Sequence, residues 1–347
     1  MTLLVLNAGS SSLKYKLFDR ETLEVRVAGI VEEIVEGGYP DAIAQMEAVL
    51  REHGVASLSE VAAIGHRVVH GGERFVASTV IDEEVEAAIE ALIPLAPLHN
   101  PANLEGIRTA RLRAPEVVQV AVFDTAFHQS LPEAAYRYAL PKALYRQMGI
   151  RRYGFHGTSH AYVARQAAER LGKPLSDTNL ITLHLGNGAS ACAIRDGRSV
   201  ETSMGMTPLE GLVMGTRPGD VDPGVLLYLA REQGYTFDRI DRLLNRESGL
   251  EGLCGDHDLR RIHSRIADGD TEAALALEIF VHRVRKYVGA YVAVLGRVDA
   301  LVFTGGIGEN DEIVRDMILE DLPFDFPVLV IPTDEELEIA METRNKL

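Results

Sequence analysis

The first nineteen residues join an apolar run to an alternating segment, the pattern of a strand pair. Leu3–Leu6 is uniformly apolar, which predicts a buried strand, and Leu13–Phe18 alternates, with Lys14 and Lys16 on its polar face. The turn between them, residues 7–12, consists of Asn, Ala, Gly and Ser. Backbone N–H groups of such a turn can approach an anion closely, and a lysine beyond it supplies a charge suited to phosphate. The pattern fits an ordinary hairpin or a phosphate-binding one.

A second copy of this plan begins at Leu180. An apolar strand, a polar residue, a Gly-rich turn and a returning strand follow one another again, with His184 in the place of Asn7 and Gly186 in that of Gly9. Two such hairpins about half a chain apart predict a duplicated domain, with the hairpins facing each other across a cleft.

The rest of the chain alternates between strand and helix patterns, which predicts an α/β architecture of two similar domains. Proline and glycine interrupt it between residues 94 and 141, where we expect the domain junction, and Asp196-Gly197 predicts a type I′ hairpin turn. Further strands are predicted at Ala62–Val69, Val117–Phe123, Leu180–Leu185, Ala189–Ile194, Ala300–Thr304 and Val328–Pro332, and the clearest helices at Asp82–Ile93, Ser159–Leu171, Thr271–Leu295 and Asp334–Thr343.

Composition narrows the class of protein. The chain has 347 residues, of which 46% are hydrophobic and 25% charged, enough for two domains with good cores. Its formal charge of −16 argues against a nucleic-acid partner, because such partners bind basic surfaces. The cations of any anion site must therefore overcome an acidic exterior.

Cysteine usage and hydropathy predict a cytoplasmic protein. Cys192 and Cys254 form no CxxC pair, so we expect two buried thiols in a reducing compartment and neither a disulfide framework nor a cysteine metal site. No stretch reaches the ~18 apolar residues of a membrane span, and the short N-terminal run lacks the basic flank of a signal peptide.

Two arginines lie in glycine-flanked positions. Arg67 ends a predicted strand before Gly71-Gly72, and Arg217 follows Met214-Gly-Thr. A guanidinium there can present a bidentate fork to a carboxylate or a phosphate, although a lone arginine fits a surface salt bridge equally well. Two together would neutralise an anionic acceptor and the phosphoryl group transferred to it.

Asp124 and His156 are further candidates. Asp124 follows an apolar strand, at the edge where α/β sheets bind ligands, and His156 lies directly before a predicted helix. Each also fits a structural role, as a helix cap or a hydrogen-bonded core histidine. The Gly305–Gly308 turn follows a strand and opens a helix, so its backbone donors can bind a nucleotide phosphate, although the chain has no Walker A motif.

Together these motifs resemble those of the acetokinase family, the kinases that form short-chain acyl phosphates. The resemblance runs in order through essentially the whole chain. It implies an α/β fold of two duplicated actin/sugar-kinase/Hsp70-like (ribonuclease H-like) domains around a central cleft. Domain I would comprise residues 1–125 and 335–347, and domain II, which binds nucleotide, residues 126–334. The motifs that carry the resemblance are Asn7–Lys14, His66–Gly72, Phe123–His128, Gly154–His160 and Gly306–Asn310.

The resemblance implies a homodimer that reversibly transfers a phosphoryl group from ATP to acetate, giving ADP and acetyl phosphate. Mg²⁺ would be the metal, with Mn²⁺ as the alternative, and neither nucleic acid nor membrane would be a partner. Arg67 and Arg217 would bind acetate and the migrating phosphoryl group. Asp124 would be the catalytic carboxylate, and His156 would stabilise the transition state.

Metal, nucleotide and methyl group also have implied binding residues. Asn7 and Glu335 would hold Mg²⁺, and Lys14 would contact a nucleotide phosphate. The remaining nucleotide contacts would come from His184, Leu185, Gly186, Asn187, Gly188, Asp258, Leu259, Arg260, Gly306, Ile307, Gly308, Glu309 and Asn310, and the methyl pocket from Val69, Leu98, Phe155 and Pro208.

The chemistry agrees with these roles. A metaphosphate-like transfer needs positioning and charge neutralisation more than proton movement. Acetate, like a side-chain carboxyl group, is ionised at pH 7 and needs no general base, so we expect Asp124 to order Mg²⁺ or its water shell. An apolar pocket discriminates one methylene by only about 1–3 kcal/mol, so propionate should be a slower substrate.

Alternatives remain at two levels. A propionate kinase would share all these motifs. A butyrate kinase fits the His66–Gly72 motif less well, and a pyrophosphate-using relative would not need the room for adenosine that the Gly306–Asn310 turn leaves. An actin- or Hsp70-like nucleotide switch would leave Arg67, Arg217 and Phe155 without a role. The chain departs from the family in a much shorter segment between Arg315 and Val328, which we expect to trim the surface, and in the Gly252–His257 loop, where relatives tend to carry serines.

Overall fold

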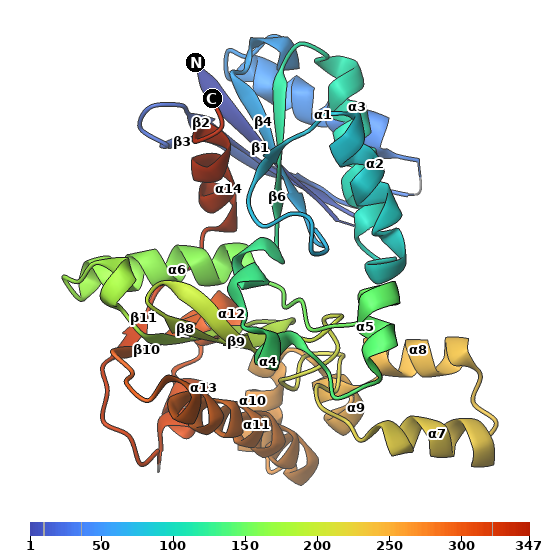
Figure 1. The fold of residues 1–347 in the computed structure, drawn as a ribbon, viewed down its shortest axis with the longest axis vertical. Coiled ribbons are helices and arrows are strands. Elements are labelled where there is room, and N and C mark those ends of the chain that lie inside the picture. Colours follow the sequence, from blue (N-terminus) through green and yellow to red (C-terminus); the bar gives the residue numbers. More distant parts are fainter. Residues whose placement is uncertain (10, 36, 321) are drawn as a thin grey trace. The chain divides into compact units, whose positions relative to one another are not determined.

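The computed structural model describes residues 1–9, 11–35, 37–320 and 322–347, so Ser10 of the first glycine-rich turn lies outside the described residues. The chain forms two compact units (Figure 1). Unit 1 contains residues 1–129, 157–162 and 334–347, and unit 2 contains residues 130–156 and 163–333. The domain division at residues 125 and 335 that the resemblance implies stays a prediction.

Unit 1 is a six-stranded mixed sheet in the order β3-β2-β1-β4-β6-β5, covered by helices on both faces (Figure 1). Its strands are β1 (Thr2–Ala8), β2 (Leu13–Asp19), β3 (Val25–Val31), β4 (Ala63–Val68), β5 (Thr79–Val80) and β6 (Val118–Phe123), its α-helices α1 (Tyr39–Glu52), α2 (Glu83–Ala91), α3 (Asn100–Arg113) and α14 (Glu335–Arg344), and its 3₁₀ helices Leu58–Glu60 and Ile93–Leu95.

The apolar run of β1 is buried on both of its faces. Leu4 and Leu6 pack in the core beneath α1, whereas Leu3 and Val5 pack in a second core with Ile339 of α14. A strand between two helical layers needs apolar residues at every position, which explains why no polar alternation interrupts this run.

Helix α14 approaches the sheet at Gly65 of β4. A Cβ atom at Gly65 would lie 2.3 Å from Oγ1 of Thr343 and 2.8 Å from Cγ2 of Ile339. Any side chain at this position would therefore push α14 away from the sheet, and Glu335 with it.

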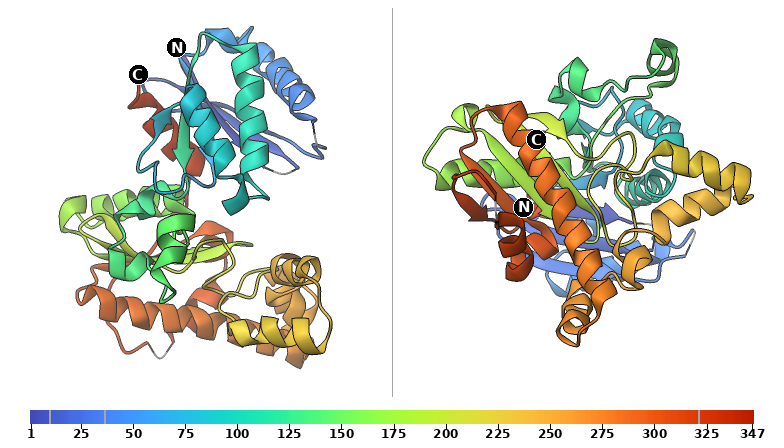
Figure 2. Two further views of the ribbon diagram at one scale, coloured as in Figure 1. Left: turned by 45° about the vertical axis from the view of Figure 1, so that its right-hand side comes forward. Right: turned by 90° about the horizontal axis from the view of Figure 1, so that it is seen from below.

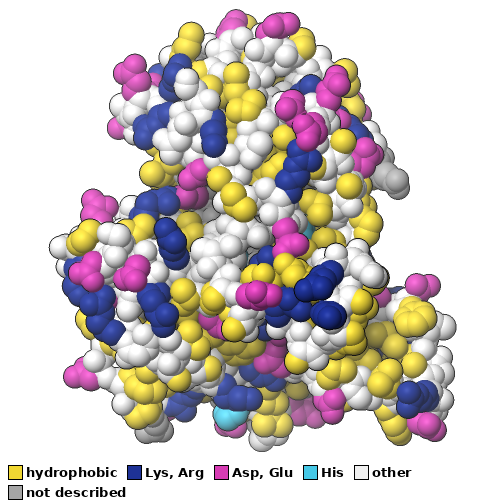
Figure 3. Space-filling view, in the orientation of Figure 1, with side chains coloured by type: hydrophobic (Ala, Val, Ile, Leu, Met, Phe, Trp, Pro, Cys, Tyr) yellow, Lys and Arg dark blue, Asp and Glu magenta, His cyan; other side chains and the backbone are white. Residues whose placement is uncertain are grey.

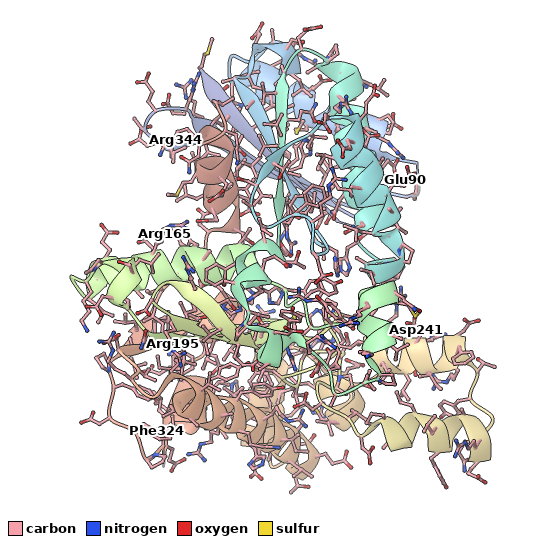
Figure 4. All side chains as sticks on the ribbon, viewed as in Figure 1. Glu90, Arg165, Arg195, Asp241, Phe324 and Arg344 are labelled. Carbon is pink, nitrogen blue, oxygen red and sulfur yellow. The ribbon has the colours of Figure 1, made fainter. Side chains whose placement is uncertain are left out.

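Polar contacts fix both ends of α14. Asp334 caps the helix by accepting a hydrogen bond from the Leu337 N–H, and its carboxylate also lies 2.8 Å from the Lys16 ammonium of β2. At the other end Arg344, labelled in Figure 4, donates to the Glu21 carbonyl at 3.1 Å. The acidic residues in its first turn also suit the positive end of the helix dipole.

Unit 2 repeats the plan with a five-stranded sheet in the order β11-β10-β7-β8-β9. The long helix α11 runs along one face of this sheet (Figure 2). The strands are β7 (Leu180–Leu185), β8 (Ala189–Arg195), β9 (Arg198–Thr202), β10 (Ala300–Thr304) and β11 (Val328–Val330). The helices are α4 (Glu133–Tyr136), α5 (Lys142–Met148), α6 (Gly157–Arg170, whose first residues belong to unit 1), α7 (Pro223–Glu232), α8 (Phe237–Arg246), α9 (Gly249–Cys254), α10 (Leu259–Ala267), α11 (Thr271–Leu295), α12 (Gly305–Asn310) and α13 (Glu312–Leu319). A 3₁₀ turn lies at Leu175–Asp177, and another, Ala126–Ser130, belongs to unit 1 except for its last residue.

The strand pairings confirm the predicted duplication. In each unit the first strand pairs antiparallel with the next strand and parallel with a strand that returns after a helical crossover. Asn7 lies opposite Lys14 in unit 1, and His184 lies opposite Ser190 in unit 2. The two glycine-rich turns therefore begin at matching points of two similar sheets.

All predicted strands and the four clearest predicted helices are present, with their ends shifted by a few residues at most. Asp196 and Gly197 have φ of 52° and 75°, as a type I′ turn requires. Cys192 and Cys254 are buried free thiols, as predicted. None of the helices in the described part of the chain has the length and apolar content to cross a membrane.

Candidate functional site

Arg67 joins three other polar residues of unit 1 that are far apart from it in sequence. Its Nη2 atom lies 2.6 Å from Oδ2 of Asp124 and its Nε 3.0 Å from Oδ1, a bidentate pair. Its Nη1 donates to Oδ1 of Asn7 at 3.3 Å, and its Nε lies 3.7 Å from Oε2 of Glu335. These residues lie near the ends of β1, β4 and β6 and at the start of α14. One guanidinium therefore brings together polar side chains from the ends of four elements.

The charges of this cluster do not balance. Asp124 is 1% exposed and Arg67 22%. Burial lowers the pKa of Arg67, but Asp124 and Glu335 raise it by more, so Arg67 stays a cation. Burial and the charge of Asp124 raise the pKa of Glu335, which Arg67 and Lys14 only partly offset. Two carboxylates beside one guanidinium leave a local excess of negative charge that an added cation would neutralise.

The donor set fits Mg²⁺. Asn7 and Glu335 offer an amide and a carboxylate oxygen, the hard ligands that Mg²⁺ prefers, and Mg²⁺ commonly takes only one or two carboxylates and completes its shell with phosphates and water. Across residues 1–9, 11–35, 37–320 and 322–347 no group of three or more His, Cys, Asp and Glu side chains could hold a metal without such help. The metal role of Asn7 and Glu335 stays a prediction.

Two buried asparagines of α3 hold the backbone of this cluster. The Asn103 amide accepts a hydrogen bond from the Val69 N–H at 3.0 Å and donates to the Ala8 carbonyl at 2.6 Å. The Asn100 amide bonds both the N–H and the carbonyl of His70. Neither residue is among those that the sequence patterns singled out, although a signal exists: two amides lie three positions apart on a helix, and Ile107 and Ala110 follow them on the buried side at helical spacing.

We expect Asn103→Leu to lower kcat for acyl-phosphate formation by about tenfold and to destabilise the fold by about 1–3 kcal/mol, because the buried Ala8 and Val69 backbone groups lose their partner. Steady-state kinetics and thermal unfolding check this. Asn345→Leu at the exposed end of α14 is the matched control. Unchanged kcat with a lowered melting temperature would show that Asn103 serves stability alone.

The two histidines beside Arg67 are not acid–base groups. Burial lowers the pKa of His66 to about 4, although the bond to Gln119 works in the opposite direction, and burial also lowers that of His70 to about 4. Both imidazoles are neutral at pH 7. His66 Nε2 lies 2.7 Å from Oε1 of Gln119, a structural contact within the sheet.

His156 forms part of a second cluster, in unit 2. It has φ of 56°, a left-handed conformation that is strained for a residue with a side chain. Its Nδ1 lies 2.9 Å from Oγ of Ser190, and its ring centroid 4.3 Å from that of His184. The neighbouring strands β7 and β8 therefore hold the imidazole that the sequence singles out, beside the second glycine-rich turn.

Arg217 lies next to this cluster. A Cβ atom at Gly188 would lie 3.1 Å from Nη2 of Arg217 and 3.4 Å from the His156 ring, so the glycine leaves room for both. The Arg217 Nη1 donates to the Pro208 carbonyl at 2.8 Å. Burial lowers the pKa of Arg217, and no carboxylate of the described residues offsets that effect. A buried cation in this state favours an anionic ligand.

A cavity of about 890 Å³ opens beside the glycine-rich turn of unit 2, which is the second such turn in the chain. Its volume is in the range of small-molecule sites. It is lined by eight of the residues predicted to bind nucleotide and by six residues that were not predicted to do so. The former are Gly186, Asn187, Asp258, Leu259, Arg260, Gly306, Ile307 and Asn310, and the latter His257, Arg261, His263, Asp311, Glu312 and Ile313.

Other predicted residues lie outside the cavity lining, and their roles stay predictions. The Glu309 carboxylate accepts hydrogen bonds from the N–H groups of Gly305 and Thr333, at 2.9 and 3.0 Å, and so holds the turn that it follows. His184, Leu185, Gly188 and Gly308 flank the lining in sequence. For the methyl pocket, Val69 of unit 1 and Phe155 of unit 2 are buried, Leu98 of unit 1 is 46% exposed, and Pro208 is half-buried.

The shortened segment between Arg315 and Val328 connects α13 to β11. Asp321 within it lies outside the described residues. Strand β11 still pairs in parallel with β10, and both the Gly306–Asn310 turn and the start of α13 line the cavity. The effect of the shortening on nucleotide choice stays open.

Sequence comparisons place the chain among known enzymes. The acetokinase family model matches residues 2–343. The acetate kinase of Streptomyces coelicolor is 51% identical over 388 aligned residues, covering 98% of this chain and 95% of that protein. The acetate kinase of Oleidesulfovibrio alaskensis is 46% identical over 400 residues, covering 100% of both. These alignments exceed the 347 residues of the chain, so both relatives contain residues without a counterpart here.

Structural comparisons agree. A propionate kinase from Francisella tularensis subsp. tularensis and the acetate kinase of Porphyromonas gingivalis both match with a TM-score of 0.93 and 43% identity, over 99% of each chain. The ROK hexokinase from Thermus thermophilus matches with a TM-score of 0.51 at 15% identity, a likeness of fold alone. The predicted α/β fold of the actin and sugar-kinase type is confirmed.

Proposed function

The chain belongs to the acetokinase family, and from this premise we propose that it transfers a phosphoryl group from ATP to acetate, forming ADP and acetyl phosphate, and catalyses the reverse reaction. The Arg67–Asp124–Glu335–Asn7 cluster is the observation that supports this best, because it combines a fixed cation for an anionic acceptor with oxygen ligands for Mg²⁺. A nucleotide switch that only hydrolyses ATP has no need of this guanidinium.

In unit 1 Arg67 binds the acetate carboxylate. Its guanidinium is held by Asp124 through Nε and Nη2, which leaves the two N–H groups of Nη1, with a single weak bond to Asn7 at 3.3 Å, available to an anion. Acetate is ionised at pH 7, so no residue has to remove a proton from it. Asn7 and Glu335 would hold Mg²⁺, which supplies charge neutralisation at the transferred phosphoryl group. Asp124 fixes Arg67 and orders the water around that metal.

In unit 2 Arg217 and His156 stabilise the phosphoryl group during transfer. Charge develops on its oxygens in a loose transition state, and preorganised donors at those oxygens are worth more than flexible ones. Arg217 is held by the Pro208 carbonyl and His156 by Ser190, so both are fixed before substrate binds. The 890 Å³ cavity binds the nucleoside of ATP.

The test is an ATP-dependent hydroxamate assay on purified protein with Mg²⁺. Acetate should give acetyl hydroxamate only when ATP is present, and pyrophosphate should not replace ATP. Hydrolysis of ATP without acyl phosphate from acetate, propionate or butyrate would refute the kinase and favour the nucleotide switch.

We expect propionate to be phosphorylated more slowly than acetate, with kcat/KM lower by about tenfold, because one methylene in an apolar pocket is worth about 1–3 kcal/mol. The same assay with both acids measures the ratio. A ratio that favours propionate would identify a propionate kinase, the second candidate, which the Francisella structure supports by its name and its TM-score of 0.93.

We propose that the protein is a homodimer and that its interface includes helices α7 and α8. Apolar side chains gather over these helices in Figure 3, with Phe237 92%, Tyr228 58% and Leu227 53% exposed. The long helix α11, in contrast, buries the apolar side chains of Phe280, Val284 and Val288. Exposed apolar patches of this kind mark interaction surfaces. A cytoplasmic location remains a prediction.

Light scattering should therefore give twice the chain mass for the wild type. Phe237→Glu combined with Leu227→Glu is expected to shift the mass to that of a monomer, whereas Leu112→Glu, at an 84% exposed position of α3, should not. A wild type that is monomeric at micromolar concentration would contradict the proposal.

A further inference from the structure

Arg152 is the centre of a partly buried polar network in unit 2 that no role assigned so far includes. Its Nη1 donates to three successive carbonyls, those of Thr202, Ser203 and Met204, at 2.9, 3.1 and 3.1 Å. Its Nη2 donates to Oε1 of Glu210 at 2.7 Å. One guanidinium therefore holds the backbone where β9 ends and the loop toward Arg217 begins.

Tyr138 closes the network from the other side of Glu210. Its hydroxyl donates to Oε2 of Glu210 at 2.5 Å and accepts a hydrogen bond from the Met206 N–H at 2.9 Å. These groups meet at Gly205, where a Cβ atom would lie 1.9 Å from Oε2 of Glu210 and 2.3 Å from the Tyr138 hydroxyl. The loop backbone therefore fits against Arg152, Glu210 and Tyr138 so closely that no side chain can stand at its centre.

The network connects two segments that carry predicted site residues. The Gly205 carbonyl accepts hydrogen bonds from the N–H groups of Tyr153 and Gly154, at 3.0 and 3.1 Å. Phe155 and His156 follow on that segment. Three residues after Gly205 comes Pro208, whose carbonyl binds Arg217. The position of Gly205 thus sets the position of Phe155 and His156 relative to Pro208 and Arg217.

We propose that Arg152, Glu210 and Tyr138 are positioning residues that set the acyl-chain preference of the enzyme, by fixing the Gly205–Arg217 loop against the Tyr153–His156 segment. The inference rests on the proposed function, in which Phe155 and Pro208 line the methyl pocket. None of the three need touch substrate. They act through the backbone of the loop, whose position decides how much room a second methylene of the acid finds.

The chemistry of the network explains why these residue types are present. A planar guanidinium can bond three carbonyls and a carboxylate at once, whereas a lysine ammonium has only three donors and no fixed fork. Glu210 neutralises the guanidinium of Arg152 and accepts a hydrogen bond from the Tyr138 hydroxyl. The far side of the loop has its own anchor, because the Gly211 N–H donates to Asp220 and the Gly211 carbonyl accepts from Arg283. Loss of one contact in the network therefore relaxes the loop without freeing it.

Tyr138→Phe is the sharpest test, because it removes one hydroxyl group and keeps the ring. Tyr136→Phe is the matched control: it lies two positions away, and its hydroxyl contacts that of Tyr145 instead, at 3.4 Å. Arg152→Lys is the second variant, which keeps the charge and loses the fork. For each protein, kcat and KM are measured for acetate, propionate and ATP, together with the melting temperature.

Tyr138→Phe and Arg152→Lys should change the acetate-to-propionate ratio of kcat/KM by about threefold or more and raise the KM for acetate by about tenfold, the size of effect expected from one or two relaxed polar contacts. The KM for ATP should stay within about twofold, because the nucleotide cavity borders other segments. Tyr136→Phe should match the wild type in every value.

Two results would overturn the proposal. The first is an unchanged acid ratio in both variants, whether or not the melting temperature falls, because a merely structural role moves stability and total activity but not the preference. The second is an equal change of the ratio in Tyr136→Phe. Failure of the proposed function looks different, since the wild type itself would then form no acyl phosphate.

A double variant gives an independent readout. If Tyr138 acts through the loop that presents Arg217, then Tyr138→Phe should add little further loss to Arg217→Ala, so that their effects on kcat/KM for acetate are not additive. Full additivity would show that Tyr138 acts elsewhere and would contradict the positioning role.

Discussion

Replacing Arg67 with alanine is expected to lower kcat/KM for acetate by about 10³-fold, the larger end of what one fixed donor to a developing charge contributes. Arg67 is the cation of unit 1 that bonds Asp124 and Asn7 together. Its removal deletes the proposed partner of the acetate carboxylate and also leaves Asp124, 1% exposed, as an uncompensated buried charge. The hydroxamate assay measures the first effect.

The second effect sets the control for this variant. Breaking a buried ion pair from one side costs about 3–5 kcal/mol, so thermal unfolding must show that Arg67→Ala is folded at the assay temperature. Arg67→Lys keeps the charge without the bidentate fork and should recover only part of the loss. Arg74→Ala, which removes an exposed arginine paired with Glu84, should leave kcat unchanged. A folded Arg67→Ala protein with more than a tenth of wild-type activity would contradict the role.

Asp124→Asn should lower kcat by about 10²–10³-fold with little change in the KM for ATP. The amide keeps the shape of the side chain but cannot hold Arg67 through a charged bidentate pair, nor order water around a divalent cation as a carboxylate does. Steady-state kinetics across a range of Mg²⁺ concentrations checks this, because the variant should need more Mg²⁺ for half-maximal rate.

Asp41→Asn, at an exposed position in the first turn of α1, is the matched control. If Asp124 instead moved a proton during the reaction, the Mg²⁺ requirement of Asp124→Asn would equal that of the wild type. That result would overturn the assignment of Asp124 to metal ordering.

Sequence patterns predicted the sheets well because both are built from apolar runs. Ala300–Thr304 is buried throughout and Leu180–Leu185 at every position except His184, so both strands are recognisable from their apolar composition. The missed strands are of another kind. β3 mixes arginine and glycine with valine, and β9 contains Arg198, Ser199 and Glu201 among its five residues. Each pairs along only one edge of its sheet, so fewer of its positions must be apolar.

The candidate site divides in the same way. Arg67, Asp124 and His156 could be found because glycines and strand ends mark them in sequence. Arg152 could not, since its role depends on which carbonyls lie within reach of its guanidinium, and the carbonyl of Thr202 belongs to a residue 50 positions away. Contacts of that kind follow from the packing of whole elements and leave no local signal. Glu309 has a structural contact that its motif did not predict, since its carboxylate accepts hydrogen bonds from the N–H groups of Gly305 and Thr333, and its nucleotide contact stays a prediction.

The way α14 completes unit 1 affects the order in which the protein can form on the ribosome. Lys16 and Asp334 are 318 positions apart, which at about 5–20 residues per second corresponds to roughly 15–65 seconds of synthesis. During that time Leu3 and Val5 have no α14 to cover them, and Arg67 and Asp124 are without Glu335. The nascent first unit must therefore wait as an open sheet, with Arg67 and Asp124 lacking the carboxylate of Glu335, while the whole of the second unit is made.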